Sequence, residues 1–98
     1  MGDLTFATQG TADIWEGKST KSARQTLPRQ LWSTAQRKLD QLRAAESLED
    51  LRSPPKNCLH PLDRDRKGQY SIKINDQYRI CFLWTEQGAR SVEICDYH

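Results

Sequence analysis

The chain lacks any apolar run that approaches the roughly 20 residues needed to span a bilayer. Its opening residues, MGDLTFATQG, contain neither the basic region nor the apolar region of a secretory signal. The N-myristoylation pattern also fails, because Phe6 stands where that pattern needs Ser or Thr. These absences argue against export and membrane attachment, and we expect a cytoplasmic protein with no membrane partner.

Cysteine is scarce and unpaired in its spacing. The 3 cysteines, Cys58, Cys81 and Cys95, are an odd number, so we expect reduced thiols in the core or the sheet rather than a disulfide framework. No C-x-x-C or H-x-x-x-H spacing supports a zinc site. We therefore expect neither a metal nor a cofactor.

A large net charge is missing as well, since the chain carries only +2 at pH 7. The positive charge is concentrated in the segment 52–73, which holds two Asp against a group of basic side chains. These are Arg52, Lys56, His60, Arg64, Arg66, Lys67 and Lys73. A local basic patch can hold phosphates even when the whole chain is nearly balanced, and a solvated charged loop is the alternative interpretation.

The 98 residues suit one domain over 1–98. The first half predicts a short strand at 4–8, one or two helical turns at 11–16, and a polar segment at 18–26 that starts the next helix. A clear amphipathic helix follows over 27–45, with Pro28 in its first turn. Its apolar positions recur every three or four residues: Leu31, Trp32, Ala35, Leu39 and Leu42. Ser47 and Asp50 match a capping box before a further short turn, which Pro54-Pro55 ends.

The C-terminal third alternates with period two and predicts three strands over 68–74, 78–84 and 90–98, joined by two short turns. Helices first and strands last indicate an α+β fold, with the N-terminal helices on one face of a mostly antiparallel sheet and a C-terminal three-strand meander. The apolar residues of the meander then face the helices: Tyr70, Ile72, Ile74, Tyr78, Ile80, Phe82, Trp84, Val92 and Ile94. Lys73 and Arg79 point to the opposite face, where their positive charges can bind an RNA backbone.

Four short motifs carry a resemblance to a known family. They are Leu59-His60-Pro61-Leu62, Gly68-Gln69-Tyr70-Ser71-Ile72, Tyr78-Arg79-Ile80 and the closing Asp96-Tyr97-His98. Their order and spacing resemble those of the HigB-type, or plasmid-killer, toxins of the RelE family. The first half of the chain fits by the order of its elements.

The resemblance implies the toxin of a type II toxin–antitoxin system that acts as a ribosome-dependent mRNA endoribonuclease and inhibits translation. It implies a HigA-like helix-turn-helix antitoxin as partner, together with the ribosome and mRNA. Operator DNA would be bound only through the antitoxin complex.

The chemistry of such a cut indicates four candidate catalytic residues. The RNA 2′-hydroxyl attacks the adjacent phosphate, which requires a base, an acid at the 5′-oxygen and positive charge on the phosphorane, but no metal. His98 and His60 are the acid–base candidates, because imidazole titrates near neutral pH. The alternatives are a disordered chain end for His98 and a structural histidine that holds the loop for His60. Arg79 is the charge stabiliser, and its alternative is a structural pair with Asp96 or Glu93. We expect Asp96 to orient His98, Arg79 or a backbone amide.

Five further residues are candidates for RNA binding: Arg64, Arg66, Lys67, Lys73 and Tyr97, the last by stacking on a base. The chain departs from the family at Asp63, where many HigB-type toxins carry a Lys. Arg64, one position later, is the expected substitute.

Two alternative functions remain at this point. ParE-like relatives share the fold but act on DNA gyrase, and the closing D-Y-H argues against that target. A catalytically weak binding or co-repressor module is the second alternative, which Asp63 favours.

Overall fold

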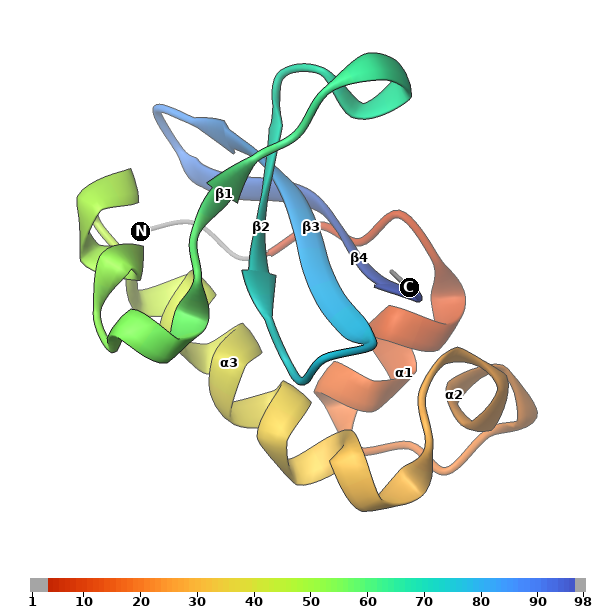
Figure 1. Ribbon diagram of the computed structural model, residues 1–98. Helices are drawn as coiled ribbons and strands as arrows, with labels where there is room; N and C mark the ends of the chain where they lie inside the picture. Colours follow the sequence, from red (N-terminus) through yellow and green to blue (C-terminus); the bar gives the residue numbers. More distant parts are fainter. Residues whose placement is uncertain (1–3, 97–98) are drawn as a thin grey trace.

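The computed structural model describes residues 4–96, with only the backbone of Arg64. The helices are α1 (Gln9–Glu16), α2 (Lys21–Thr26) and α3 (Trp32–Ala44), with the 3-10 turns η1 (Arg29–Leu31), η2 (Leu48–Arg52), η3 (Pro55–Asn57) and η4 (Arg64–Arg66). The strands are β1 (His60–Pro61), β2 (Gln69–Lys73), β3 (Tyr78–Thr85) and β4 (Gly88–Asp96). Figure 1 shows the sheet lying across the helices.

Local sequence signals set the limits of the first two helices. The Thr8 side chain caps α1 by accepting from the amide of Thr11, and Gly17 ends the helix with a left-handed φ of 77°. The polar segment 18–26 was expected to start the next long helix, but it forms the separate helix α2. Leu27 is extended, with φ −155°, because the residue before a proline disfavours helical geometry.

The long amphipathic helix is confirmed, although α3 starts at Trp32 and not near Pro28. Pro28 has an extended ψ of 138° and precedes the turn η1. The buried positions of α3 are those with helical spacing: Trp32, Ala35, Leu39 and Leu42. The capping box of Ser47 and Asp50 is present at the start of η2.

The sheet is antiparallel throughout, with strand order β1-β2-β3-β4, and the predicted C-terminal meander is confirmed. Strand β1 was not predicted; it pairs His60 with Ser71 and Pro61 with Tyr70. The strand predicted over 4–8 is wrong. That segment makes a single parallel bridge, from Phe6 to Val92, because the chain turns at once into α1.

A β-bulge interrupts the pairing of β3 and β4. Cys81 pairs with Glu93 and Leu83 pairs with Arg90, so two residues of β4 lie opposite one residue of β3. Ser91 sits in this bulge with a positive φ of 53°. The extra residue turns Val92 and its neighbour Ile94 toward the helices, where both are buried.

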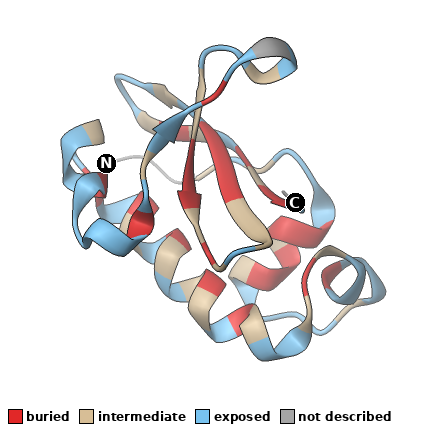
Figure 2. Cartoon of the chain, in the orientation of Figure 1, coloured by how far each residue is buried: buried red, intermediate tan, exposed pale blue. Residues whose placement is uncertain are grey.

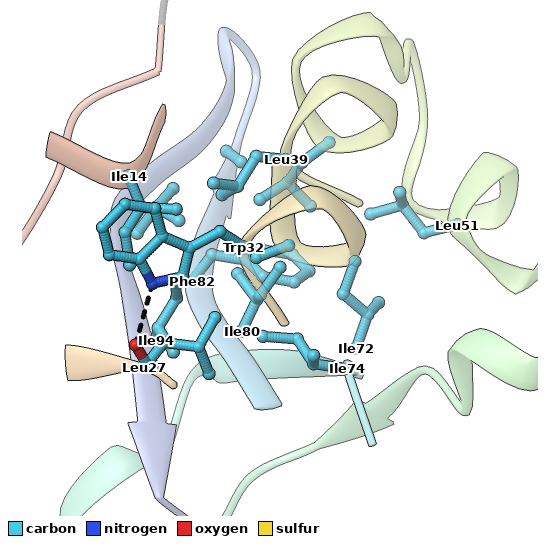
Figure 3. Packing of buried hydrophobic residues seen from close by; sticks show 14 of the residues in the cluster. Ile14, Leu27, Trp32, Leu39, Leu51, Ile72, Ile74, Ile80, Phe82 and Ile94 are labelled. Atoms are coloured by element: carbon cyan, nitrogen blue, oxygen red, sulfur yellow. Dashed lines mark hydrogen bonds between the residues drawn. The ribbon is translucent and has the colours of Figure 1, made fainter. Parts of the chain in front are cut away.

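The core lies between the helices and one face of the sheet, which confirms the α+β class (Figures 2 and 3). Ile72, Ile80 and Phe82 of the sheet are fully buried in this cluster. The indole N–H of Trp32 donates to the Leu27 carbonyl at 2.8 Å, which satisfies the polar atom of a buried ring (Figure 3). Among residues 4–96, no helix has the length and apolar character to cross a membrane.

Gly10 marks the closest approach of α1 to α2, and its replacement tests this packing. A Cβ atom at position 10 would lie 1.9 Å from the Thr26 Oγ1 and 2.7 Å from the Ser22 carbonyl oxygen. Although alanine favours helices over glycine, we expect Gly10→Ala to destabilise the protein by about 1–3 kcal/mol through overpacking. Urea unfolding measures the change, with Ser33→Ala at an exposed site of α3 as the control. An unchanged or increased stability would contradict the tight contact.

Candidate functional site

The sheet face that points away from the helices, here called the outer face, collects several of the predicted site residues. Lys73 lies directly opposite Arg79, and Arg79 lies opposite Cys95. His60 lies opposite Ser71 in the same sheet. Directly paired residues have Cβ atoms about 4.5–5.5 Å apart and share a face. His60, Ser71, Lys73 and Arg79 therefore form one continuous group on the outer face.

Arg79 is held by two neutral acceptors. Its Nε donates to the Ser71 Oγ at 2.7 Å, and its Nη2 donates to the backbone carbonyl of Cys58 at 2.6 Å. Within the described residues, its Nη1 makes no hydrogen bond and no carboxylate pairs with it. The guanidinium is thus fixed in position while its positive charge stays available to an anion.

The Cys58 carbonyl owes its position to a buried amide. Asn57 is fully buried, and its Nδ2 donates to the carbonyls of Leu51 at 3.1 Å and Ser53 at 3.3 Å. Its Oδ1 accepts from the Lys38 ammonium of α3. Asn57 therefore fixes the loop of η2 and η3 against α3 and, through the next residue, holds the acceptor of Arg79.

His60 is exposed at the edge of the sheet, where its partner in the pairing, Ser71, is also the partner of Arg79. One imidazole and one fixed guanidinium thus flank the same buried hydroxyl. This arrangement offers a proton-transfer group and a fixed positive charge to a substrate lying on the outer face.

The two carboxylates expected beside Arg79 have other partners. Asp96, at the end of β4, lies opposite Tyr78 and accepts from the Gln77 Nε2 at 3.1 Å. Glu93 makes an ion pair of 3.1 Å with Arg66. The alternative of a structural pair between Arg79 and Asp96 or Glu93 is wrong, because the Ser71 hydroxyl and the Cys58 carbonyl take that place.

The basic candidate residues differ in whether another residue of the chain already pairs with them. Arg66 donates to Gln69 at 3.2 Å and to Glu93, so it ties the loop before β2 to β4. Lys73 pairs at 2.8 Å with the exposed Asp76, which raises the pKa of Lys73. Lys67 is exposed. The backbone of Arg64 lies in η4 after the exposed Asp63, whereas its side chain, Tyr97 and His98 lie outside the described residues.

The thiols divide into two kinds. Cys81 and Cys95 are buried together with Leu62 on the outer face, as expected. A hydrogen bond between the two thiols and burial raise the pKa of Cys95. Cys58, expected in the core or the sheet, is instead exposed, with a left-handed φ of 49° after η3. Its backbone carbonyl, rather than its thiol, contacts Arg79.

Comparison with known families identifies the family of this chain. A family model described as the RelE-like toxin HigB of type II toxin–antitoxin systems matches residues 5–98. The chain belongs to this family. The matched range includes all four motifs on which the sequence resemblance depended and the strand that carries Arg79.

Two curated relatives of this HigB-like toxin match the chain in part. Toxin HigB-1 of Vibrio cholerae is 40% identical over 60 residues, which cover 61% of this chain and 63% of the relative. An uncharacterized protein of Haemophilus influenzae is 43% identical over 58 residues, which cover 59% of this chain and 57% of the relative. Each match therefore spans less than two thirds of the relative's own length.

The RelE-like fold of this HigB-like toxin also has a solved counterpart. The YoeB–YefM complex from Staphylococcus aureus contains a chain that superposes with a TM-score of 0.63 at 16% identity. The superposition covers 100% of this chain and 98% of the other. At this identity, the likeness establishes the fold.

Sequence reasoning missed two residues of the site in this HigB-like toxin. Ser71 shares the outer face with Arg79 by strand alternation, so its small hydroxyl was open to prediction as a partner. Asn57 gave no such signal, because an Asn after two prolines reads as ordinary turn chemistry. Its role depends on contacts with residues far away in the sequence.

Replacing Asn57 tests whether this amide supports the site of the HigB-like toxin. Asn57→Ala leaves the Leu51 carbonyl without its donor and the Lys38 ammonium without its acceptor. We expect a loss of about 1–3 kcal/mol in the free energy of unfolding, measured in urea. Gln25→Ala, at an exposed site of α2, is the matched control and is expected to change stability by less than about 0.5 kcal/mol. Equal stabilities of the two variants would refute the anchoring role.

Proposed function

We propose that this toxin is an endoribonuclease that cuts mRNA on the ribosome and thereby inhibits translation. The observation that carries the proposal is the guanidinium of Arg79, fixed by neutral acceptors on the outer face beside His60. A fixed cation with its charge available fits the phosphorane of an RNA cleavage reaction better than a structural ion pair would.

In the proposed reaction, the RNA 2′-oxygen forms a bond to the adjacent phosphorus and the bond from phosphorus to the 5′-oxygen breaks. One imidazole accepts the proton of the 2′-hydroxyl, and the other gives a proton to the departing 5′-oxygen. His60 and His98 are the two imidazoles, in either assignment. Arg79 stabilises the negative charge on the phosphorane oxygens. The products are a 2′,3′-cyclic phosphate and a 5′-hydroxyl, and the reaction requires no metal ion.

The direction of β4 supports the role of His98. Cys95 lies opposite Arg79, so β4 ends close to the fixed guanidinium. His98 follows Cys95 by three residues, which span at most about 11 Å, so a side chain at position 98 remains within reach of the Arg79 end of the sheet. We propose that Asp96 orients His98 and that Tyr97 stacks on a base of the message.

The remaining basic residues are proposed to hold phosphates of the message or of ribosomal RNA. Lys67 is exposed and Lys73 is engaged only in a surface ion pair, so both remain able to bind an anion. Arg64 is proposed to take the role of the Lys that the family often carries at the position of Asp63. Arg66 is proposed to act chiefly by fixing the loop, because Glu93 already neutralises it.

A helix-turn-helix antitoxin of the HigA kind is the proposed partner, and operator DNA would be bound only through their complex. The Staphylococcus aureus structure, which is a YoeB–YefM complex, supports an antitoxin partner for this fold. Co-expression with the product of a neighbouring helix-turn-helix gene should yield a stable complex, and the toxin alone should arrest growth.

Arg79 gives the sharpest test of the proposed chemistry. We expect Arg79→Ala to lower the rate of ribosome-dependent mRNA cleavage by about 10²–10³, because one preorganised charge donor is lost. The cleavage rate of Arg79→Lys should lie between those of the wild type and Arg79→Ala, since an ammonium keeps the charge without the planar guanidinium. The rate is measured by mapping 5′ ends on ribosomes programmed with a defined message. Circular dichroism checks that each variant folds.

Arg52→Ala removes the same charge from an exposed position on η2 and serves as the control. Cleavage at the normal rate by Arg79→Ala would reject the assignment of Arg79. A wild-type protein that leaves messages intact but blocks gyrase would reject the ribonuclease function itself.

The proposed catalytic role of His98 is tested by a substitution and by an extension of the chain. We expect His98→Ala, and equally a five-residue extension after His98, to abolish most of the growth arrest while the folded content stays unchanged. The same extension placed before Met1 is the control and should leave toxicity intact. Full toxicity of the C-terminally extended protein would remove His98 from the mechanism.

A further inference from the structure

A basic hollow lies beside the outer face, and residues of α3, η3 and the end of β2 line it. Its volume is about 410 Å³, and four of its lining residues are cations. They are Arg37, Lys38, Lys56 and Lys73. No carboxylate is among the described residues that line it.

Lys73 pairs with Asp76, but the other three cations of the hollow have no carboxylate partner among the described residues. Lys38 donates to the neutral Asn57 side chain, and Arg37 donates to the Thr34 hydroxyl at 3.4 Å. Lys56 makes no ion pair or hydrogen bond with the described residues. Burial lowers the pKa of Lys38, and the nearby charges of Arg37 and Lys56 lower it further. Like charges gathered in one concave site repel one another unless an anion lies between them.

The hollow is continuous with the proposed catalytic group. Cys58 lines the hollow, and its carbonyl is the acceptor that holds Arg79. Lys73 also lines it and lies directly opposite Arg79. An RNA strand with one phosphate at Arg79 therefore has this hollow beside it for a neighbouring phosphate.

We propose that the hollow binds a backbone phosphate of the RNA strand whose scissile phosphate lies at Arg79. The inference rests on the proposed ribonuclease function, because it assigns the hollow to the same substrate. Concave shape and excess positive charge suit a phosphodiester group, and continuity with Arg79 favours RNA over an acidic segment of a protein partner.

The test uses the full chain and a single-stranded 2′-O-methyl RNA, which cannot be cleaved by its own 2′-oxygen. The double variant Arg37→Ala/Lys56→Ala removes two exposed charges, so the fold should be retained. Each lost phosphate contact should reduce the slope of log affinity against log salt by about 0.7. Because the hollow holds one phosphate, we expect the double variant to lose about 0.7 of slope and roughly 5-fold in affinity near 0.1 M salt, measured by fluorescence anisotropy.

Lys21→Ala/Arg24→Ala is the matched control, because it removes the same charge from exposed positions of α2 that do not line the hollow. The proposal predicts that this variant keeps the wild-type slope within about 0.3. Equal losses in the two double variants would overturn the proposal, since general charge would then explain the binding.

Two other outcomes would also overturn the proposal. The first is unchanged RNA affinity with weakened antitoxin binding, which would make the hollow a protein-docking site. The second is an NMR titration in which inorganic phosphate saturates the amide resonances of the lining residues below millimolar concentration, while RNA leaves them unchanged. That result would indicate a site for a free anion. Neither outcome touches the ribonuclease function, which fails only if the wild-type toxin leaves messages uncut on the ribosome.

Discussion

The hydrogen bond from Arg79 to the Cys58 carbonyl joins the two halves of this toxin's site. One end of the bond belongs to the central strand β3, and the other belongs to a loop outside the sheet. The loop keeps its place only because Asn57 is buried and bonded to α3 and to its own turns. The geometry of the guanidinium therefore depends on a polar contact between this loop and α3.

The choice of acceptors has an electrostatic consequence. A carboxylate beside Arg79 would hold the side chain equally well but would cancel the charge that the proposed reaction uses at the phosphate. The hydroxyl of Ser71 and the carbonyl of Cys58 fix the direction of the guanidinium and leave its charge intact. Arg66 shows the opposite case on the same face, since its pair with Glu93 secures a loop. Arg79 in β3 and Arg66 in η4 thus have different roles because their partners differ in charge.

Patterns local to the chain were sufficient to predict the main elements. The period-two alternation of β2, β3 and β4 correctly placed Arg79 and Lys73 opposite the core, and the helical spacing of α3 correctly placed its buried face. The errors lie where distant contacts decide the structure. The segment 4–8 meets β4 in a single bridge before the chain turns into α1, and β1 is too short to show alternation. Asn57 acts through residues 51 and 38, which no local pattern connects to it.

The bulge at Ser91 sets which way the last strand faces. The bulge takes up one residue, so that Val92 and Ile94 pack on the helices and Cys95 lies opposite Arg79. A strand of the same length that paired without the bulge would turn Glu93 into the apolar interior and Ile94 outward. The backbone irregularity at Ser91 therefore decides, as much as residue identity does, which side chains of β4 lie on the outer face beside Arg79.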